Sequence, residues 1–276
     1  MSITEIFEIS IQLLQVFVLF FVIYLSSKLM VIEGNGPFPA FFTFAMISFL
    51  LSGFYSSIYT ILRPDTRMPF AVDEIAECAS LLLISAGLEA VAGKNQKFNI
   101  GALIFSFLFI LVNIALWIAW SGEWGQDIIF GIPYIYITYL LLRGMFYTHA
   151  INMAERYIAA IVSSFLVLFH TIRFYVSGTA ATAVDIFCVV FEYGIAGWLF
   201  AKCIFALRQS VDEEKSLYLT CTLYLWTILI SYMSADALYD IALFINTMTI
   251  PLMLMAVKKN CRLGVREDDV QKGESQ

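Results

Sequence analysis

Charged side chains are scarce in this sequence. Lys, Arg, Asp and Glu make up 14% of the 276 residues, whereas a water-soluble domain carries about 25%. Runs without any charged side chain cover 9–27, 34–62, 98–122 and 216–235. Each run is long enough to cross a hydrocarbon core of about 30 Å, which takes about 20 helical residues. The shortage of charge therefore excludes a soluble protein and indicates a membrane protein.

Strand-like alternation is missing as well. The strands of membrane β-barrels are segments of about ten residues in which apolar and polar side chains alternate. The apolar runs of this chain do not show that alternation. We therefore predict an all-α, polytopic transmembrane helix bundle. The first segment lacks a basic start and a cleavage site, so we expect it to stay in the protein as a helix.

The usual chemical signatures are also absent. The five cysteines are odd in number and show no CxxC spacing, and there are only two histidines, so neither a disulfide framework nor a metal site is indicated. No Gly-rich phosphate loop, HExxH or GxSxG motif occurs. We expect no cofactor, no nucleic-acid partner and no enzymatic activity. An intramembrane lipid-modifying enzyme that works with acids alone is the least supported alternative.

Apolar runs and turn residues together predict nine spans. The expected spans are 7–29, 38–62, 72–92, 99–121, 127–147, 152–176, 181–207, 215–234 and 236–257. They form a single transmembrane domain over 1–257, which a short, polar and disordered cytoplasmic tail over 258–276 follows. The last two spans are joined by little more than "MSAD" at 233–236. A re-entrant final pair, with seven or eight crossings, stays open.

Basic residues set the orientation. If the N-terminus is outside, the cytoplasmic loops and tail hold 13 of the 16 Lys and Arg residues. Only Arg63, Arg67 and Arg173 fall on the outer side. Short cytoplasmic loops are enriched in Lys and Arg. We therefore predict the N-terminus outside and the C-terminus in the cytoplasm, in a cytoplasmic (inner) membrane.

Acidic residues recur where chain segments enter from the outer side. Asp73, Asp127, Asp185 and Asp236 begin the third, fifth, seventh and ninth spans, and the first and third of these follow Ala-Val. Tandem hairpin repeats, which occur in transporters, explain this period. A plain row of hairpins with helix-capping acids explains it too. Both interpretations stay open.

Some acids lie deeper than a helix cap requires. Glu77 and Asp240 follow Asp73 and Asp236 by four residues, and Glu192 follows Asp185 by seven, so each pair shares a helix face. A carboxylate at such depth is costly and normally faces a cavity or a partner. We expect either an outward-facing acidic cavity or ion pairs with bases such as Arg173. The candidate ligand- or ion-binding residues are Asp73, Glu77, Asp185, Glu192, Asp240, Arg173 and His170.

Glu192 is the strongest single candidate. It lies inside an apolar span with no base beside it, and Gly194 and Gly197 follow it. Small residues permit close approach of helices, so this segment is expected to be packed or to line a pocket. His170, three residues before Arg173, either relays protons or serves only for packing.

Two functions remain open at this stage. The first is a transporter or channel-like protein for a cation, a proton or a small cationic solute, which outward-facing carboxylates would collect. The second is a non-catalytic receptor, sensor or assembly subunit that binds a ligand in its outer cavity. Its protein partner would meet that cavity or the cytoplasmic tail. The lipid bilayer is the partner common to both.

The predicted threading is testable by labelling. A cysteine at position 122, in place of Gly122, should react with an impermeant thiol reagent from outside intact cells, and one in place of Asn95 should not. The 13-to-3 division of basic residues is the reason. Reaction of both from the same side contradicts the nine-span threading.

Overall fold

The computed structural model describes residues 3–32, 36–62, 72–92, 96–122, 124–209, 213–234 and 236–274. Within these ranges the chain forms α-helices and no strand. The helices are α1 (Ile3–Met30), α2 (Phe38–Leu62), α3 (Val72–Ala92), α4 (Ile100–Ser121), α5 (Trp124–Tyr147), α6 (Met153–Arg173), α7 (Gly178–Arg208), α8 (Glu213–Met233) and α9 (Asp236–Glu274).

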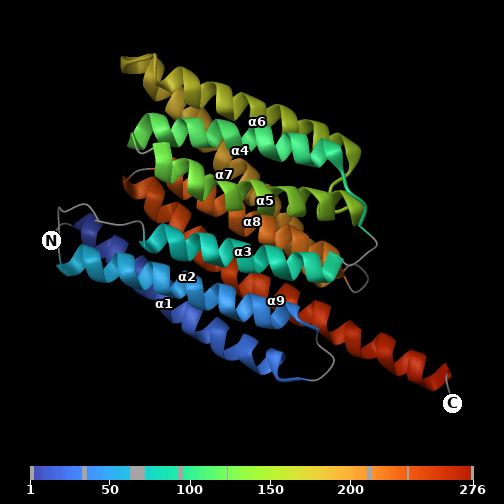
Figure 1. Cartoon of the computed structure of the whole chain (residues 1–276). Coiled ribbons are helices and arrows are strands. Elements are labelled where there is room, and N and C mark those ends of the chain that lie inside the picture. The colour runs from blue at the N-terminus through green and yellow to red at the C-terminus, as the bar shows by residue number, and fades with distance from the viewer. Residues whose placement is uncertain are drawn as a thin grey trace.

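All nine of these described helices are long and apolar enough to cross a membrane. The predicted helix bundle with nine spans is therefore confirmed, and the hairpin near 234 joins two helices of spanning length. The two ends of the chain lie at opposite ends of the bundle (Figure 1), as an odd number of crossings requires. The side of the membrane on which each end lies stays a prediction.

Helix α9 is longer than expected. It runs from Asp236 to Glu274, so the tail that we expected to be disordered continues the last helix. The segment 258–274 contains two glycines, at 264 and 273, but no proline. A proline would break the helix, and none is present in this segment. Pro251 and Pro133 both lie inside helices.

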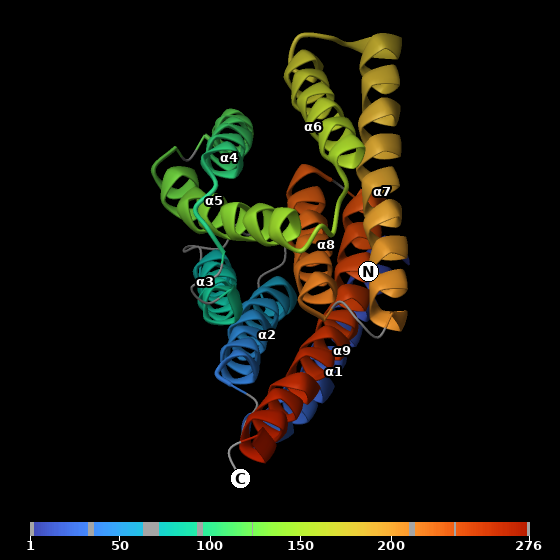
Figure 2. The same cartoon turned by 90° about the vertical axis from the view of Figure 1, so that its right-hand side faces the viewer.

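Helix α8 is the centre of the bundle, and α6 is its least buried member. α8 packs against α5, α7 and α9, while α1 and α2 pack together beside α9. Figure 2 shows α7 on one side of α8, α4 and α5 on the other, and α6 above it. Leu166 is the one buried residue of α6. α6 thus buries little of its surface against the bundle.

The two helices of each predicted hairpin do pack together. Contacts join α2 to α3, α4 to α5, α6 to α7 and α8 to α9. Whether these hairpins are true repeats stays a prediction.

A buried polar network joins the first helix to the last two. Gln15 Nε2 of α1 donates to Asn246 Oδ1 of α9 at 3.3 Å. Asn246 Nδ2 donates to Thr227 Oγ1 of α8 at 2.9 Å. Polar groups inside a bilayer must find partners within the protein, so this network fixes how α1, α8 and α9 pack.

The two ends of the bundle differ in charge. At one end, here called the basic end, Arg143 pairs with Glu89 at 2.9 Å, Lys202 pairs with Glu155 at 2.5 Å, and Lys259 Nζ donates to the Ala206 carbonyl. The opposite end, here called the acidic end, carries Glu74 and Asp127 in the first turns of α3 and α5. The basic end is the one that the sequence predicts to be cytoplasmic.

A substitution at Gly144 tests how closely α5 packs on α8. A Cβ atom there would lie 2.1 Å from the Tyr218 ring. Tyr218 is fully buried, and its hydroxyl oxygen accepts a 2.7 Å hydrogen bond from Gln96 Nε2. Gly144→Ala should therefore lower the free energy of unfolding by about 1–3 kcal/mol, as overpacking does. Thermal melting in detergent micelles measures this change.

Gly197→Ala is the matched control for that experiment. No atom lies within 4 Å of a Cβ at Gly197, and alanine favours a helix by about 1 kcal/mol. Equal melting temperatures for the two variants would contradict the packing described for Gly144.

Candidate functional site

Four cavities follow one another along α4. The first, here called the chamber, has a volume of about 480 Å³ between α4, α5, α6, α7 and α8. Two narrow cavities come next. We call the first, of about 20 Å³, the Glu192 cavity, and the second, of about 30 Å³, the His170 cavity. The fourth, the vestibule, holds about 300 Å³ at the acidic end.

Neighbouring cavities share lining residues, so they form one row. The shared residues are, in order from the chamber to the vestibule, Phe109, Trp226 and Leu229; Leu116, His170 and Met233; and Trp117, Trp120 and Tyr232. The row extends from the vestibule at the acidic end to the chamber, which Glu155 lines.

Glu77 lies behind the vestibule, held by two tyrosines. The Tyr134 hydroxyl donates to Glu77 Oε1, and the Tyr232 hydroxyl donates to the same atom at 3.1 Å. The Trp117 ring packs on both tyrosines, with ring centres 5.5 and 5.6 Å away. Residues from α3, α4, α5 and α8 therefore converge on one carboxylate.

The vestibule itself presents two further acids. Gln126 Nε2 donates to Glu74 Oε2 at 2.5 Å, and the Ser121 hydroxyl donates to Asp127 Oδ2 at 2.6 Å. Glu74 and Asp127 both line the cavity. The lining of the vestibule therefore includes two acids.

Glu192 and His170 form the central pair. His170 Nε2 lies 2.6 Å from Glu192 Oε1, and the two side chains are 15% and 5% exposed. This separation requires one proton between the two atoms. Either the ring, neutral or charged, donates its Nε2–H to the carboxylate, or the carboxylic acid donates to the neutral ring. The pair can thus hold a proton and hand it on.

The backbone of Glu192 is also held. Trp226 Nε1 of α8 donates to the Glu192 carbonyl oxygen at 3.0 Å. Trp226 lines both the chamber and the Glu192 cavity. A side chain of α8 therefore stands between the chamber and the pair.

Arg173 and Asp185 form a second pair, outside the row. Arg173 Nε donates to Asp185 Oδ1 at 2.6 Å, but the side chains are 42% and 51% exposed. An exposed ion pair contributes little stability. The geometry places this pair at the surface, near the ends of α6 and α7.

Asp73 and Asp240 are the remaining two predicted acids. Asp73 is half-buried at the start of α3, and Asp240 is buried in α9. Neither lines any of the four cavities. The structure thus brings together His170 with Glu192 and Arg173 with Asp185, and it does not gather the five predicted acids around one of these cavities.

The glycines after Glu192 serve a different purpose from the one predicted. The expectation that Gly194 and Gly197 let helices approach closely is wrong, because no atom lies within 4 Å of a Cβ at either position. Gly194 instead lines the chamber. The missing side chain leaves space where a ligand or lipid can lie.

Sequence reasoning missed the partners of the acids. Tyr134 and Tyr232, which bond to Glu77, and Trp226, which bonds to the Glu192 carbonyl, were not singled out, and neither was Trp117. Trp120 and Trp124 are 61% and 68% exposed, whereas the ring nitrogen of Trp117 is buried. The available signal was a tyrosine hydroxyl deep in an apolar span, which needs a hydrogen-bond partner.

Neither a metal centre nor a known relative informs the site. Among the residues that the structure describes, no three His, Cys, Asp or Glu side chains lie close enough to hold a metal ion. Comparison of the chain with protein-family models, curated proteins and solved structures finds no match.

The two pairs on α6 should respond differently to mutation. His170→Leu leaves the buried Glu192 carboxyl without its partner, so stability should fall by about 1–3 kcal/mol. Arg173→Leu breaks the exposed pair and should cost less than about 1 kcal/mol. Thermal melting in detergent micelles compares the two variants.

The double variant His170→Leu, Glu192→Leu is the internal check. Removal of both polar partners should restore part of the stability that His170→Leu loses. A double variant that is less stable than either single one would contradict a coupled buried pair.

Proposed function

We propose that the protein is a membrane transport protein for a small cation, and that this cation is the proton. The observation that carries the proposal is the row of cavities along α4 with the His170–Glu192 pair in its narrow part. Acids and other polar side chains accompany this row from the acidic end of the bundle. Intramembrane carboxylates and histidines of this kind are typical of proton relays.

The width of the row favours a proton over other cations. A water molecule needs at least about 10–15 Å³ of such volume, so cavities of about 20 and 30 Å³ hold one or two waters each. A hydrated metal ion or an organic cation needs more room. A proton needs only a hydrogen-bonded chain.

The polar groups stand in an order that suits such a chain. Glu74 and Asp127 line the vestibule, and Glu77 lies behind it, bonded to Tyr134 and Tyr232. Trp117 Nε1 is buried without a protein partner beside the His170 cavity, where a water molecule would satisfy it. That water would bridge the Tyr232 side of the row to His170.

The row continues beyond Glu192 into the chamber. The hydroxyl groups of Thr138, Ser163 and Thr222 line it, and Glu155 stands at its other end beside Lys202. A proton that leaves Glu192 toward the basic end would pass these groups. Transport from the acidic end to the basic end is therefore the direction that we propose for uptake into a cell, across the cytoplasmic membrane.

A receptor is the second candidate function. The chamber favours it, because a cavity of about 480 Å³ has the size of a small-molecule site. Trp226 would connect a ligand there to Glu192. A protein partner would then meet the extended C-terminal part of α9, and no enzymatic step is part of either proposal.

Proton flux into liposomes tests the proposed function. The purified chain is reconstituted around a pH-sensitive dye, and a potassium gradient with valinomycin drives protons inward. We expect acidification faster than in empty liposomes, with a rate that depends on the external pH. Glu192→Gln keeps the shape of the side chain but cannot exchange a proton, so the rate should fall to the leak and lose its pH dependence.

Glu89→Gln is the matched control. It removes one carboxylate from another membrane helix, in a pair with Arg143 that lines none of the four cavities. Its flux should equal that of the wild type. Wild-type flux no faster than the leak, or full flux in a folded Glu192→Gln variant, would contradict the proposal.

A further inference from the structure

The chamber contains a buried hydroxyl group with no partner. Thr138 of α5 is 8% exposed, and its Oγ1 makes no hydrogen bond within the protein. The other buried threonines of the described chain are Thr43, Thr220, Thr227, Thr247 and Thr249, and each of their hydroxyls donates to a backbone carbonyl. Thr138 is thus the exception, and it lines the chamber.

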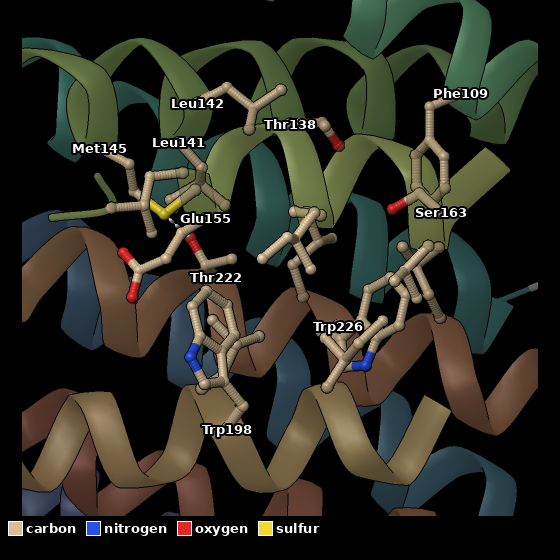
Figure 3. A pocket seen from close by; sticks show the side chains of 18 of the residues that line it. Phe109, Thr138, Leu141, Leu142, Met145, Glu155, Ser163, Trp198, Thr222 and Trp226 are labelled. Carbon is tan, nitrogen blue, oxygen red and sulfur yellow. Dashed lines mark hydrogen bonds between the residues drawn. The ribbon is translucent and has the colours of Figure 1, made fainter. Parts of the chain in front are cut away.

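The view into the chamber shows where this hydroxyl lies. In Figure 3, Thr138 projects from α5 on the side of the cavity that faces Trp226. A buried polar group without a partner is costly, and a ligand with one hydrogen-bonding group would satisfy it.

Most of the remaining lining of the chamber is apolar. It includes the aromatic rings of Phe105, Phe109, Phe191, Trp198 and Trp226, and its other hydroxyl or charged side chains are Ser163, Thr222 and Glu155. Such a surface, with a few polar groups to fix orientation, is typical of small-molecule sites. The volume of about 480 Å³ falls within the range of such sites.

The one acid of the chamber is already neutralised. Glu155 Oε1 pairs with Lys202 Nζ at 2.5 Å, and Glu155 Oε2 accepts from the Asn152 backbone N–H at 2.8 Å. Both carboxylate oxygens are therefore occupied. A charged ligand would find no counter-charge, so the chamber suits a neutral molecule.

The chamber also reaches the apolar surface of the bundle. Ile158 of α6 and Val190 of α7 line it and are 60% and 61% exposed. In a bilayer, exposed apolar side chains of membrane helices contact acyl chains. A lipid-soluble molecule can therefore arrive from the membrane between these side chains.

We propose that the chamber binds a neutral, lipid-soluble molecule that has one hydroxyl head group and an apolar body, such as a long-chain alcohol. The head group bonds to Thr138 Oγ1, and the body lies against the aromatic rings. Trp226 contacts this body and also donates a hydrogen bond to the Glu192 carbonyl. Binding in the chamber therefore affects the position of the His170–Glu192 pair. The binding site stands without the proposed proton transport.

Photolabelling of the full chain in liposomes tests this site. The probe is dodecanol with a diazirine in mid-chain, and the competitors are unlabelled dodecanol and dodecane. We expect saturable labelling of peptides that line the chamber, with dodecanol competing roughly 2- to 10-fold better than dodecane, as one hydrogen bond allows. Thr138→Val keeps the shape without the hydroxyl, so it should remove this preference.

Two glycine variants show whether the label occupies the chamber. Gly194→Leu adds a side chain at a position that lines the chamber and has room for a Cβ atom, and it should abolish saturable labelling. Gly197→Leu is the control, because its position is equally open but does not line the chamber. Both variants should melt at similar temperatures in detergent.

Three outcomes would overturn the proposal. They are labelling that does not saturate, equal labelling of the two leucine variants, and an alcohol preference that persists in Thr138→Val. Because the readout is covalent labelling, it is independent of proton flux. A labelled chamber without flux would contradict the proposed transport alone, and flux without labelling would contradict this site alone.

Discussion

A polar group inside a bilayer must find its partner within the protein, and this constraint accounts for much of the structure. Asn246 joins Gln15 and Thr227, and Glu77 is held by two tyrosine hydroxyls. Glu192 is held by His170 at 2.6 Å. Each of these contacts joins different helices, so the polar groups that are costly to bury also specify which helices pack together.

The spans were predictable from the sequence, whereas the partners of the acids were not. Span positions follow from local composition, because about 20 apolar residues suffice to cross the bilayer. The partners are set by tertiary packing: Glu77 meets tyrosines 57 and 155 residues away, and Glu192 meets a histidine 22 residues away. Helical spacing placed Asp73 and Glu77 on one face, but it could not supply the tyrosine partners of Glu77.

The cavities of this bundle lie where its helices are less tightly packed. α6 buries only Leu166 and is joined to α7 by the pairs His170–Glu192, Arg173–Asp185 and Glu155–Lys202, and no atom lies within 4 Å of a Cβ at Gly194 or Gly197 of α7. A wide apolar chamber and a wide acidic vestibule therefore lie on either side of a narrow middle section. Trp226 lines both the chamber and the Glu192 cavity, and Tyr232 lines both the His170 cavity and the vestibule.

The central claim is that Glu192 exchanges a proton with His170 in the folded protein. Infrared difference spectroscopy of the reconstituted chain, recorded while the external pH is lowered, observes this exchange directly. The account predicts a change in the carbonyl-stretch band of a protonated carboxylic acid that is present in the wild type and in Glu89→Gln, and absent from Glu192→Gln. The same band change in Glu192→Gln, or no change in the wild type, would contradict it.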